Sequence, residues 1–152
     1  MAYNLGKREF RRLEGGLIFT QKDIESGEMY PDAAVGCTWG VDIHVPAPQN
    51  EKLFVEWPFR SVAHHKLSGR HPVRYLPCRC LYSSKIHNLF MAGRNVSQSH
   101  LSLAMFRVQC TTGMMGEVVG ITAAICREQE IFPPYVYAEK LIVLQEKLKA
   151  GV

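Results

Sequence analysis

The sequence lacks three features that would identify a broad class of protein at once. It has no run of roughly 18 apolar residues, the length that a membrane-spanning helix needs. It has no Gly-x-Gly-x-x-Gly turn, with which dinucleotide-binding folds often begin. Residues 1–20 carry basic side chains but no apolar block before a cleavage site, unlike a secretory signal. We therefore expect a cytoplasmic protein with no membrane partner and no N-terminal dinucleotide fingerprint.

Disulfide-rich and zinc-binding frameworks are also missing. The five cysteines are odd in number and follow no disulfide spacing, which indicates a reducing compartment. One residue separates Cys78 from Cys80, whereas zinc and thiol redox pairs usually have two residues between them. We predict no metal in the functional site. The alternative, a metal-binding domain, would use His64, His65, His71, Cys78 and Cys80.

The positive charge of the chain is modest and dispersed. The net charge is +4, but the basic residues lie at 7–12, at 60–79 and near the C-terminus rather than in one cluster. This distribution disfavours nucleic acid as a partner. Hydrophobic residues make up 47% and charged residues 21%, as in ordinary globular proteins. A chain of 152 residues is long enough for one domain with a real core.

Short periodic segments predict a mixed fold of the α+β or α/β class. Thr20 and Asp23 have the spacing of an N-cap before a helix that ends at Gly27. Residues 38–45 alternate between apolar and polar, as in a strand with one buried face. Leucines at i, i+3 and i+7 predict a packing helix over 136–149. Further strands are expected at 17–20 and 53–59, and a strand or turn at 32–38. Residues 73–82 are expected to be extended, with an edge strand or a bend at Pro77, and residues 97–109 to form a short amphipathic helix.

The most informative stretch runs from residue 88 to residue 126. Leu89–Ala92 has the length of a buried strand and is followed by Gly93. A long helix is predicted from about Thr112 to Arg127. Three glycines share one face of this helix: Gly113, Gly116 and Gly120.

Two interpretations of this glycine face remain open. Glycine costs a helix interior roughly 0.5–1 kcal/mol relative to alanine, so something is expected to approach that backbone closely. The first interpretation is close packing of the helix on a sheet. In the second, the first N–H groups of the helix bind a ligand, because they lack partners within the helix and carry partial positive charge. Thr111 or Thr112 would then cap the helix, and Gly113 would admit the ligand.

Two pairs of polar side chains are candidates for chemistry. Asp42 and His44 share one face of the predicted strand, where a carboxylate could tune an imidazole for proton transfer. His100 and Arg107 are seven residues apart, on about the same face of the predicted short helix. The alternative for both pairs is a solvent-exposed polar face.

Several motifs, taken in their order along the chain, resemble one family. Residues 6–15 read Gly-Lys-Arg-Glu-Phe-Arg-Arg-Leu-Glu-Gly, residues 39–44 read Trp-Gly-Val-Asp-Ile-His, and residues 76–82 read Leu-Pro-Cys-Arg-Cys-Leu-Tyr. Residues 88–97 read Asn-Leu-Phe-Met-Ala-Gly-Arg-Asn-Val-Ser, and residues 111–116 read Thr-Thr-Gly-Met-Met-Gly. The set resembles the FAD-dependent oxidoreductases with a glutathione-reductase-type fold, in particular the xanthan lyase-like group, over most of the chain.

The resemblance implies the C-terminal portion of an FAD-binding, Rossmann-like flavoprotein fold. Residues 1–87 would form strands and loops of the substrate region, and residues 88–152 the C-terminal segment of the FAD-binding domain, with a flavin-facing helix and a C-terminal helix. The N–H groups of Gly113–Met115 would point at the flavin pyrimidine ring. The implied FAD-binding residues are Gly93, Arg94, Asn95, Thr112, Gly113, Met114, Met115 and Gly116. The implied catalytic residues are His100, His44 and Asp42, and the implied contacts to a small-molecule substrate are Arg8, Arg12 and Arg107.

The N-terminal dinucleotide motif of that family has no counterpart here. The enzyme interpretation therefore has an alternative: a non-catalytic truncated fragment, or a subunit that completes a flavin site on a partner chain. A missing half of the sheet would leave strand edges and apolar surface uncovered. This predicts association with an N-terminal FAD-binding chain, or self-association.

Overall fold

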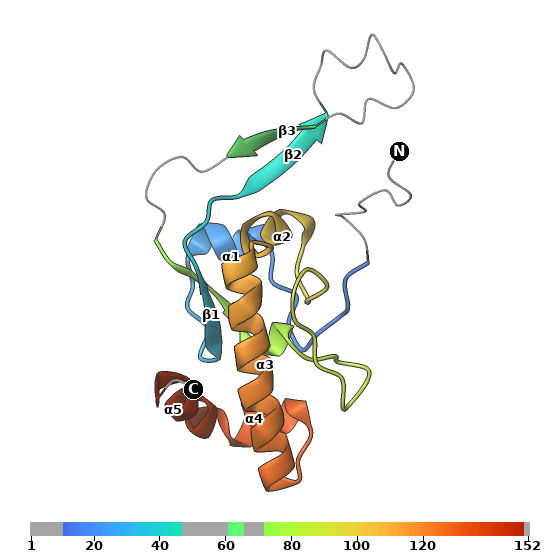
Figure 1. Cartoon of the computed structure of the whole chain (residues 1–152), viewed down its shortest axis with the longest axis vertical. Coiled ribbons are helices and arrows are strands. Elements are labelled where there is room, and N and C mark those ends of the chain that lie inside the picture. Colours follow the sequence, from blue (N-terminus) through green and yellow to red (C-terminus); the bar gives the residue numbers. More distant parts are fainter. Residues whose placement is uncertain (1–10, 47–60, 66–71, 151–152) are drawn as a thin grey trace.

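The computed structural model describes residues 11–46, 61–65 and 72–150, and of 43–46 and 61–65 it describes the backbone only. Arg8, His71 and the strand predicted at 53–59 lie outside these residues. The described part combines five helices with two small antiparallel sheets, which confirms the expectation of a mixed fold of helices and strands (Figure 1). Within it, no helix is both long and apolar enough to cross a membrane.

The first helix, α1 (Gln21–Ser26), is fixed by its two caps. Thr20 precedes it in an extended conformation, and the Thr20 N–H donates to Asp23 Oδ2 at 2.6 Å. Gly27 closes the helix with a φ of +67°, in the left-handed region where glycine has no steric penalty. Both predicted ends of this helix are therefore confirmed.

The sheet nearest the core pairs two strands that are far apart in the sequence. β1 (Ala33–Cys37) runs antiparallel to β4 (Arg74–Pro77). The two strands lie within the stretches 32–38 and 73–82, for which extended structure was predicted. The second stretch is shorter than predicted, because a 3-10 turn, η2 (Cys78–Cys80), begins directly after Pro77.

The other sheet is a separate antiparallel pair, β2 (Asp42–Pro46) with β3 (Ser61–His65). It lies beyond α2, at the end of the molecule opposite α4 and α5 (Figure 1). The strand predicted over 38–45 therefore begins only at Asp42, after the chain has left β1.

Two predicted strands, around Phe19 and Phe90, are wrong, because each is reduced to a single bridge. Phe19 bridges to Gln98, and Phe90 bridges to Tyr82. Bends and turns close to these bridges leave too few consecutive residues for a ladder.

Two helices follow each other in the informative stretch. α2 (His100–Phe106) confirms the predicted short helix. α3 (Gln109–Gln129) begins three residues before the predicted Thr112, so that predicted boundary is wrong. The N-cap is Val108, and the Thr112 N–H already bonds to its carbonyl oxygen at 3.0 Å. Valine is a poor N-cap type, so no residue signals this start.

The C-terminal helix predicted over 136–149 is in fact two helices. α4 (Pro133–Glu139) begins at Pro133, where the fixed φ of proline suits the first helical position. α5 (Leu141–Ala150) follows after Lys140, whose φ of −125° and ψ of 19° interrupt the helical geometry.

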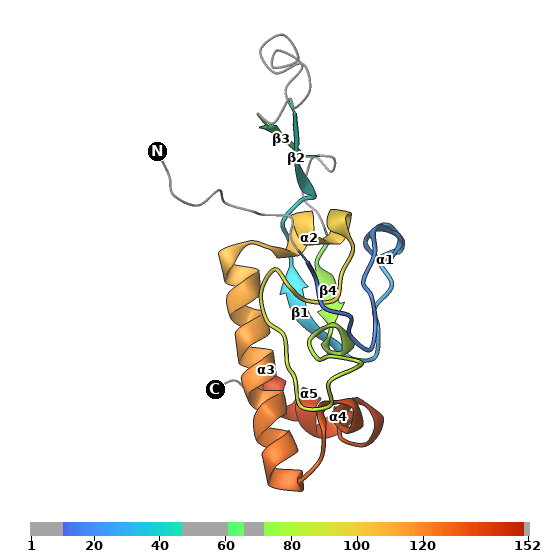
Figure 2. The ribbon, with the colours of Figure 1, turned by 90° about the vertical axis from the view of Figure 1, so that its right-hand side faces the viewer.

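The core lies between α3 and the β1–β4 sheet, with α4 and α5 packed near the C-terminal end of α3 (Figure 2). The rings of Phe19 and Phe106 meet edge to face, with centroids 5.5 Å apart. The opposite face of α3 points away from the rest of the described chain (Figure 2). The buried residues of α3 are Thr111, Met115, Val118, Thr122 and Ile125.

A buried ion pair connects the start of β1 with η2. The carboxylate of Asp32 accepts hydrogen bonds from the backbone N–H of Arg79 at 2.9 Å, from its Nε at 3.0 Å and from its Nη2 at 2.9 Å. The guanidinium of Arg79 also lies 4.4 Å from the centre of the Tyr137 ring in α4. Through Arg79, the Asp32 carboxylate thus links the start of β1 with η2 and α4.

Cys78 makes the fold sensitive to alkaline pH. Its thiol lies 3.9 Å from Thr122 Oγ1, and burial raises its pKa from the ordinary 9.0 to about 12. The unfolded chain therefore loses this proton first, and native stability falls as the pH rises above about 9. Cys78→Ala is expected to show a shallower fall in the free energy of unfolding between about pH 9 and 11, measured by urea denaturation. Cys110→Ala removes an exposed thiol and is the control; equal slopes for the wild type and Cys78→Ala would contradict the prediction.

Candidate functional site

The glycine face of α3 is open. Gly113, Gly116 and Gly120 are exposed, and a Cβ added at any of them would meet no atom within 4 Å. They lie on the side of the helix away from its buried residues. Close packing of this face on a sheet, the first interpretation, is therefore wrong for the described chain. A bare helix backbone that faces outward suits the approach of a ligand or of another chain.

One loop reaches α3 from the other half of the informative stretch. Gly93 has a φ of +97°, a conformation that side-chain-bearing residues rarely adopt. Its N–H donates to Sδ of the buried Met115 at 3.3 Å. The Leu13 N–H donates to the Asn95 carbonyl oxygen at 2.9 Å, which places Arg12 beside this loop. The fold thus brings together two segments of the predicted cofactor site.

The free N–H groups of α3 lie one turn earlier than predicted. In a helix that begins at Gln109, the N–H groups from Thr112 onward bond within the helix, and those of Val108–Thr111 have no partner in it. The expectation that the N–H groups of Gly113–Met115 point at a ligand is therefore wrong. Thr112 and the glycines can still present side-chain and backbone surface outward, whereas Met114 lines a pocket on the sheet side.

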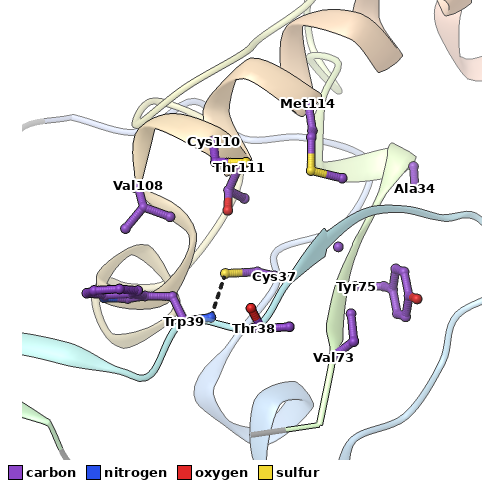
Figure 3. A pocket seen from close by; sticks show the side chains of 11 residues that line it. Ala34, Cys37, Thr38, Trp39, Val73, Tyr75, Val108, Cys110, Thr111 and Met114 are labelled. Carbon is purple, nitrogen blue, oxygen red and sulfur yellow. Dashed lines mark hydrogen bonds between the residues drawn. The ribbon is translucent and has the colours of Figure 1, made fainter. Parts of the chain in front are cut away.

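That pocket opens between β1, β4 and the first turn of α3 (Figure 3). Its volume is about 500 Å³. Trp39 is 46% exposed at its edge, and the Cys37 thiol beneath it donates to the Met105 carbonyl oxygen at 3.3 Å and accepts the Trp39 N–H at 3.4 Å. The lining residues are Ala34, Gly36, Cys37, Thr38, Trp39, Val73, Tyr75, Val108, Cys110, Thr111 and Met114.

Sequence reasoning missed this pocket. It depends on the pairing of β1 with β4 and on the early start of α3, and no residue spacing reveals either feature. The usable signal was Trp39 followed by Gly40, because a large aromatic side chain beside a flexible residue often lies at a binding surface.

A predicted substrate residue pairs with a predicted catalytic residue. Arg107, the C-cap of α2, donates from Nη2 to the Asp42 carbonyl oxygen at 3.0 Å and to its Oδ2 at 3.4 Å. The two side chains are only 14% and 17% exposed. This contact attaches the start of β2 to the end of α2. His44 is two residues farther along the same strand, β2.

His100 lies at the other end of α2. It is exposed in the first turn, about 10 Å along the helix axis from Arg107. It lines a second cavity, of about 690 Å³, that Asp42 does not line. The described residues therefore do not gather the predicted catalytic side chains in one cavity. The other residues of this cavity are Thr20, Gln21, Lys22, Glu25, Ser99 and Leu101.

The cysteines of η2 are buried. Burial raises the pKa of the Cys78 thiol to about 12 and also raises that of Cys80, so both are protonated thiols at neutral pH. Among the described side chains, no group of three or more His, Cys, Asp or Glu residues could hold a metal ion.

The fold holds a glycine-containing loop against a helix whose glycine face is uncovered within the described chain. The sequence matches the family model described as FAD dependent oxidoreductase over residues 1–148, and the chain belongs to this family. FAD is the cofactor of the family. No curated protein and no solved structure matches the chain.

Proposed function

We propose that the chain forms the flavin end of an FAD-dependent oxidoreductase, as the C-terminal portion of a Rossmann-like fold of the glutathione-reductase type. The observation that carries this proposal is the bond from the Gly93 N–H to Met115, beside the open glycine face of α3. In this arrangement residues 1–87 supply the substrate region and residues 88–152 supply the C-terminal segment of the FAD-binding domain.

The residues present fit one end of FAD. At Gly93 an added Cβ would have Asn95 Oδ1, 4.0 Å away, as its neighbour, and at Gly113 and Gly116 it would meet nothing. A flat ring can therefore approach both backbones to van der Waals contact. Arg94, which is exposed, suits the ribityl or pyrophosphate part through a charge-assisted hydrogen bond. FAD supplies the redox chemistry, and these residues bind and orient it.

The N-terminal end of α3 adds a favourable potential. A helix of 21 residues carries a partial positive charge of roughly +0.5 at its start. Thr112 and Gly113 lie in the second turn, within reach of this field. This field would stabilise an electron-rich edge of the cofactor beside Thr112 and Gly113. The N–H groups of these two residues need not take part, because they already bond within the helix.

The substrate side rests on the predicted polar residues. Asp42 and His44, two residues apart in β2, would bind substrate or move a proton, with Arg107 as the group that positions Asp42. His100 would contact substrate from its own cavity at the start of α2, apart from Asp42. Arg12, beside the Asn95 loop, would contact an anionic substrate, as would Arg8.

A second candidate function is that of a subunit or fragment that completes a flavin site on a partner. The open face of Gly113, Gly116 and Gly120 favours it, because bare glycine backbone lets another helix pack closely. The partner would be a dinucleotide-binding chain, which supplies the missing adenosine contacts, or a second copy of this chain.

The loop at Gly93 provides the test of the proposed function. Gly93→Ala places a side chain at a φ of +97° and is expected to weaken flavin binding about tenfold, measured by visible difference absorption. Gly27→Ala is the matched control, since Gly27 also has a positive φ but caps α1. Both variants should lose about 1–2 kcal/mol of stability. Equal flavin binding by the two variants would argue against the site.

A further inference from the structure

The pocket beside β1 and β4 is separate from the proposed flavin contacts. Successive residues of a helix project about 100° apart, so neighbouring side chains of α3 serve different surroundings. Met114 lines the pocket, Met115 meets the Gly93 loop, and Gly113 and Gly116 face outward. A ligand in the pocket therefore does not compete for the glycine face.

Within the described chain, the unpartnered hydroxyl of a largely buried residue, Thr111, is accessible from this pocket. Thr111 is 4% exposed, and its hydroxyl points into the pocket (Figure 3). It makes no hydrogen bond in the described part of the chain, whereas the hydroxyls of Thr112 and Thr122 in the same helix donate to backbone oxygens at 3.0 and 2.7 Å. A ligand atom in the pocket can therefore accept a hydrogen bond from this hydroxyl.

The start of α3 borders the same pocket. Val108, Cys110 and Thr111 line the pocket and belong to the turn whose N–H groups have no partner within the helix. The N-terminus of a long helix favours an anion. None of the eleven lining residues is charged, so no carboxylate of the protein repels a bound anion.

The rest of the wall is apolar and partly aromatic. Trp39 and Tyr75 contribute rings, while Val73, Val108 and Met114 contribute aliphatic surface. The volume of about 500 Å³ lies within the range typical of sites for small organic molecules. The pocket thus has donors at one end and room for a ring-sized body.

We propose that this pocket binds a small carboxylate with an apolar, ring-sized body. The carboxylate accepts hydrogen bonds from the Thr111 hydroxyl and from the free N–H groups at the start of α3. The apolar body lies against Trp39, Tyr75 and Met114. This site is additional to the proposed flavin site and does not depend on it.

The test is a titration of the full chain with 3-phenylpropionate. Trp57→Phe leaves Trp39 as the one tryptophan, so its fluorescence reports on the pocket. In this background a saturable change is expected, with propionate and 3-phenylpropan-1-ol binding at least about tenfold more weakly because each lacks one half of the recognised structure. Thr111→Val should raise the dissociation constant about tenfold, whereas Thr111→Ser keeps the hydroxyl and stays within about twofold.

Thiol labelling gives a second readout that needs no variant. Cys110 is exposed and lines the pocket, whereas Cys126 is partly exposed and does not line it. Bound 3-phenylpropionate should slow alkylation of Cys110 by iodoacetamide, followed by mass spectrometry, and leave the rate at Cys126 unchanged. An unprotected Cys110 would overturn the proposal.

The remaining outcomes are equally decisive. Absence of a saturable fluorescence change, or equal affinity of the Thr111→Val chain and its parent, would overturn the proposal. Flavin binding is measured on the same chains and should be unchanged in Thr111→Val, because Thr111 faces the pocket. If the chain binds 3-phenylpropionate but not flavin, the proposed function fails and this inference stands. If the chain binds flavin but not 3-phenylpropionate, this inference fails and the proposed function stands.

Discussion

Asp32→Ala is expected to lower the free energy of unfolding by about 3–5 kcal/mol, the largest effect on stability among the substitutions proposed for this chain. The change removes the acceptor of three hydrogen bonds from Arg79 and leaves that guanidinium partly buried without its charge partner. It also releases the link between β1 and η2. A loss of this size is a large fraction of the stability of a typical domain. Urea denaturation at neutral pH measures it.

The matched control is an exposed ion pair. Lys85 Nζ lies 2.8 Å from Glu14 Oε2, with both side chains more than half exposed. Glu14→Ala should leave the free energy of unfolding nearly unchanged, because solvent screens such pairs. Similar losses for Asp32→Ala and Glu14→Ala would show that the buried pair does not organise the fold.

Gly116→Leu is expected to separate stability from flavin binding. The added side chain meets nothing within 4 Å at its first atom, and leucine is the better helix former, so the free energy of unfolding should rise by about 0.5–1 kcal/mol. The same side chain fills the outward face beside the proposed cofactor contacts. Flavin binding, measured by visible difference absorption, should weaken at least about tenfold.

Ala124→Leu is the control for this change. Ala124 is exposed on α3, two turns beyond Gly116, so its substitution adds comparable bulk away from the proposed contacts. It should leave flavin binding at the wild-type level. If Gly116→Leu also left flavin binding unchanged, the glycine face would have no part in holding the cofactor.

Local signals predicted α1 well and α3 less well. The caps of α1, Thr20 and Gly27, act through bonds and dihedral angles within a few residues, so the sequence pattern is sufficient. At α3 the helix begins after Val108, a residue type without capping capacity, and extends through Gln109 and Cys110. The surrounding packing decides that start, and a pattern of residue types does not record it.

The glycine periodicity predicted a shared face but not its surroundings. Helix geometry alone places Gly113, Gly116 and Gly120 together. Whether that face is covered depends on every other element of the fold, and the fold leaves it open. The same limit applies to the contact of Arg107 with Asp42, which are 65 residues apart. Periodicity suggested partners for each of them on its own element and missed the contact across elements.

The family resemblance supplied what local patterns did not. It placed the loop after Ala92 and the long helix in one site, and the bond from the Gly93 N–H to Met115 joins those two segments. The pocket lined by Trp39 and Thr111 has no counterpart in that reasoning, because it results from the pairing of two strands about 40 residues apart.

The central proposal is that this chain binds FAD through its flavin end. Titration of the purified chain with FAD and with FMN, followed by visible difference absorption, tests it most directly, with ADP as competitor. The account predicts saturable band shifts, similar dissociation constants for the two flavins and no displacement by ADP. Absence of a shift with both flavins, or displacement of FAD by ADP, would contradict it.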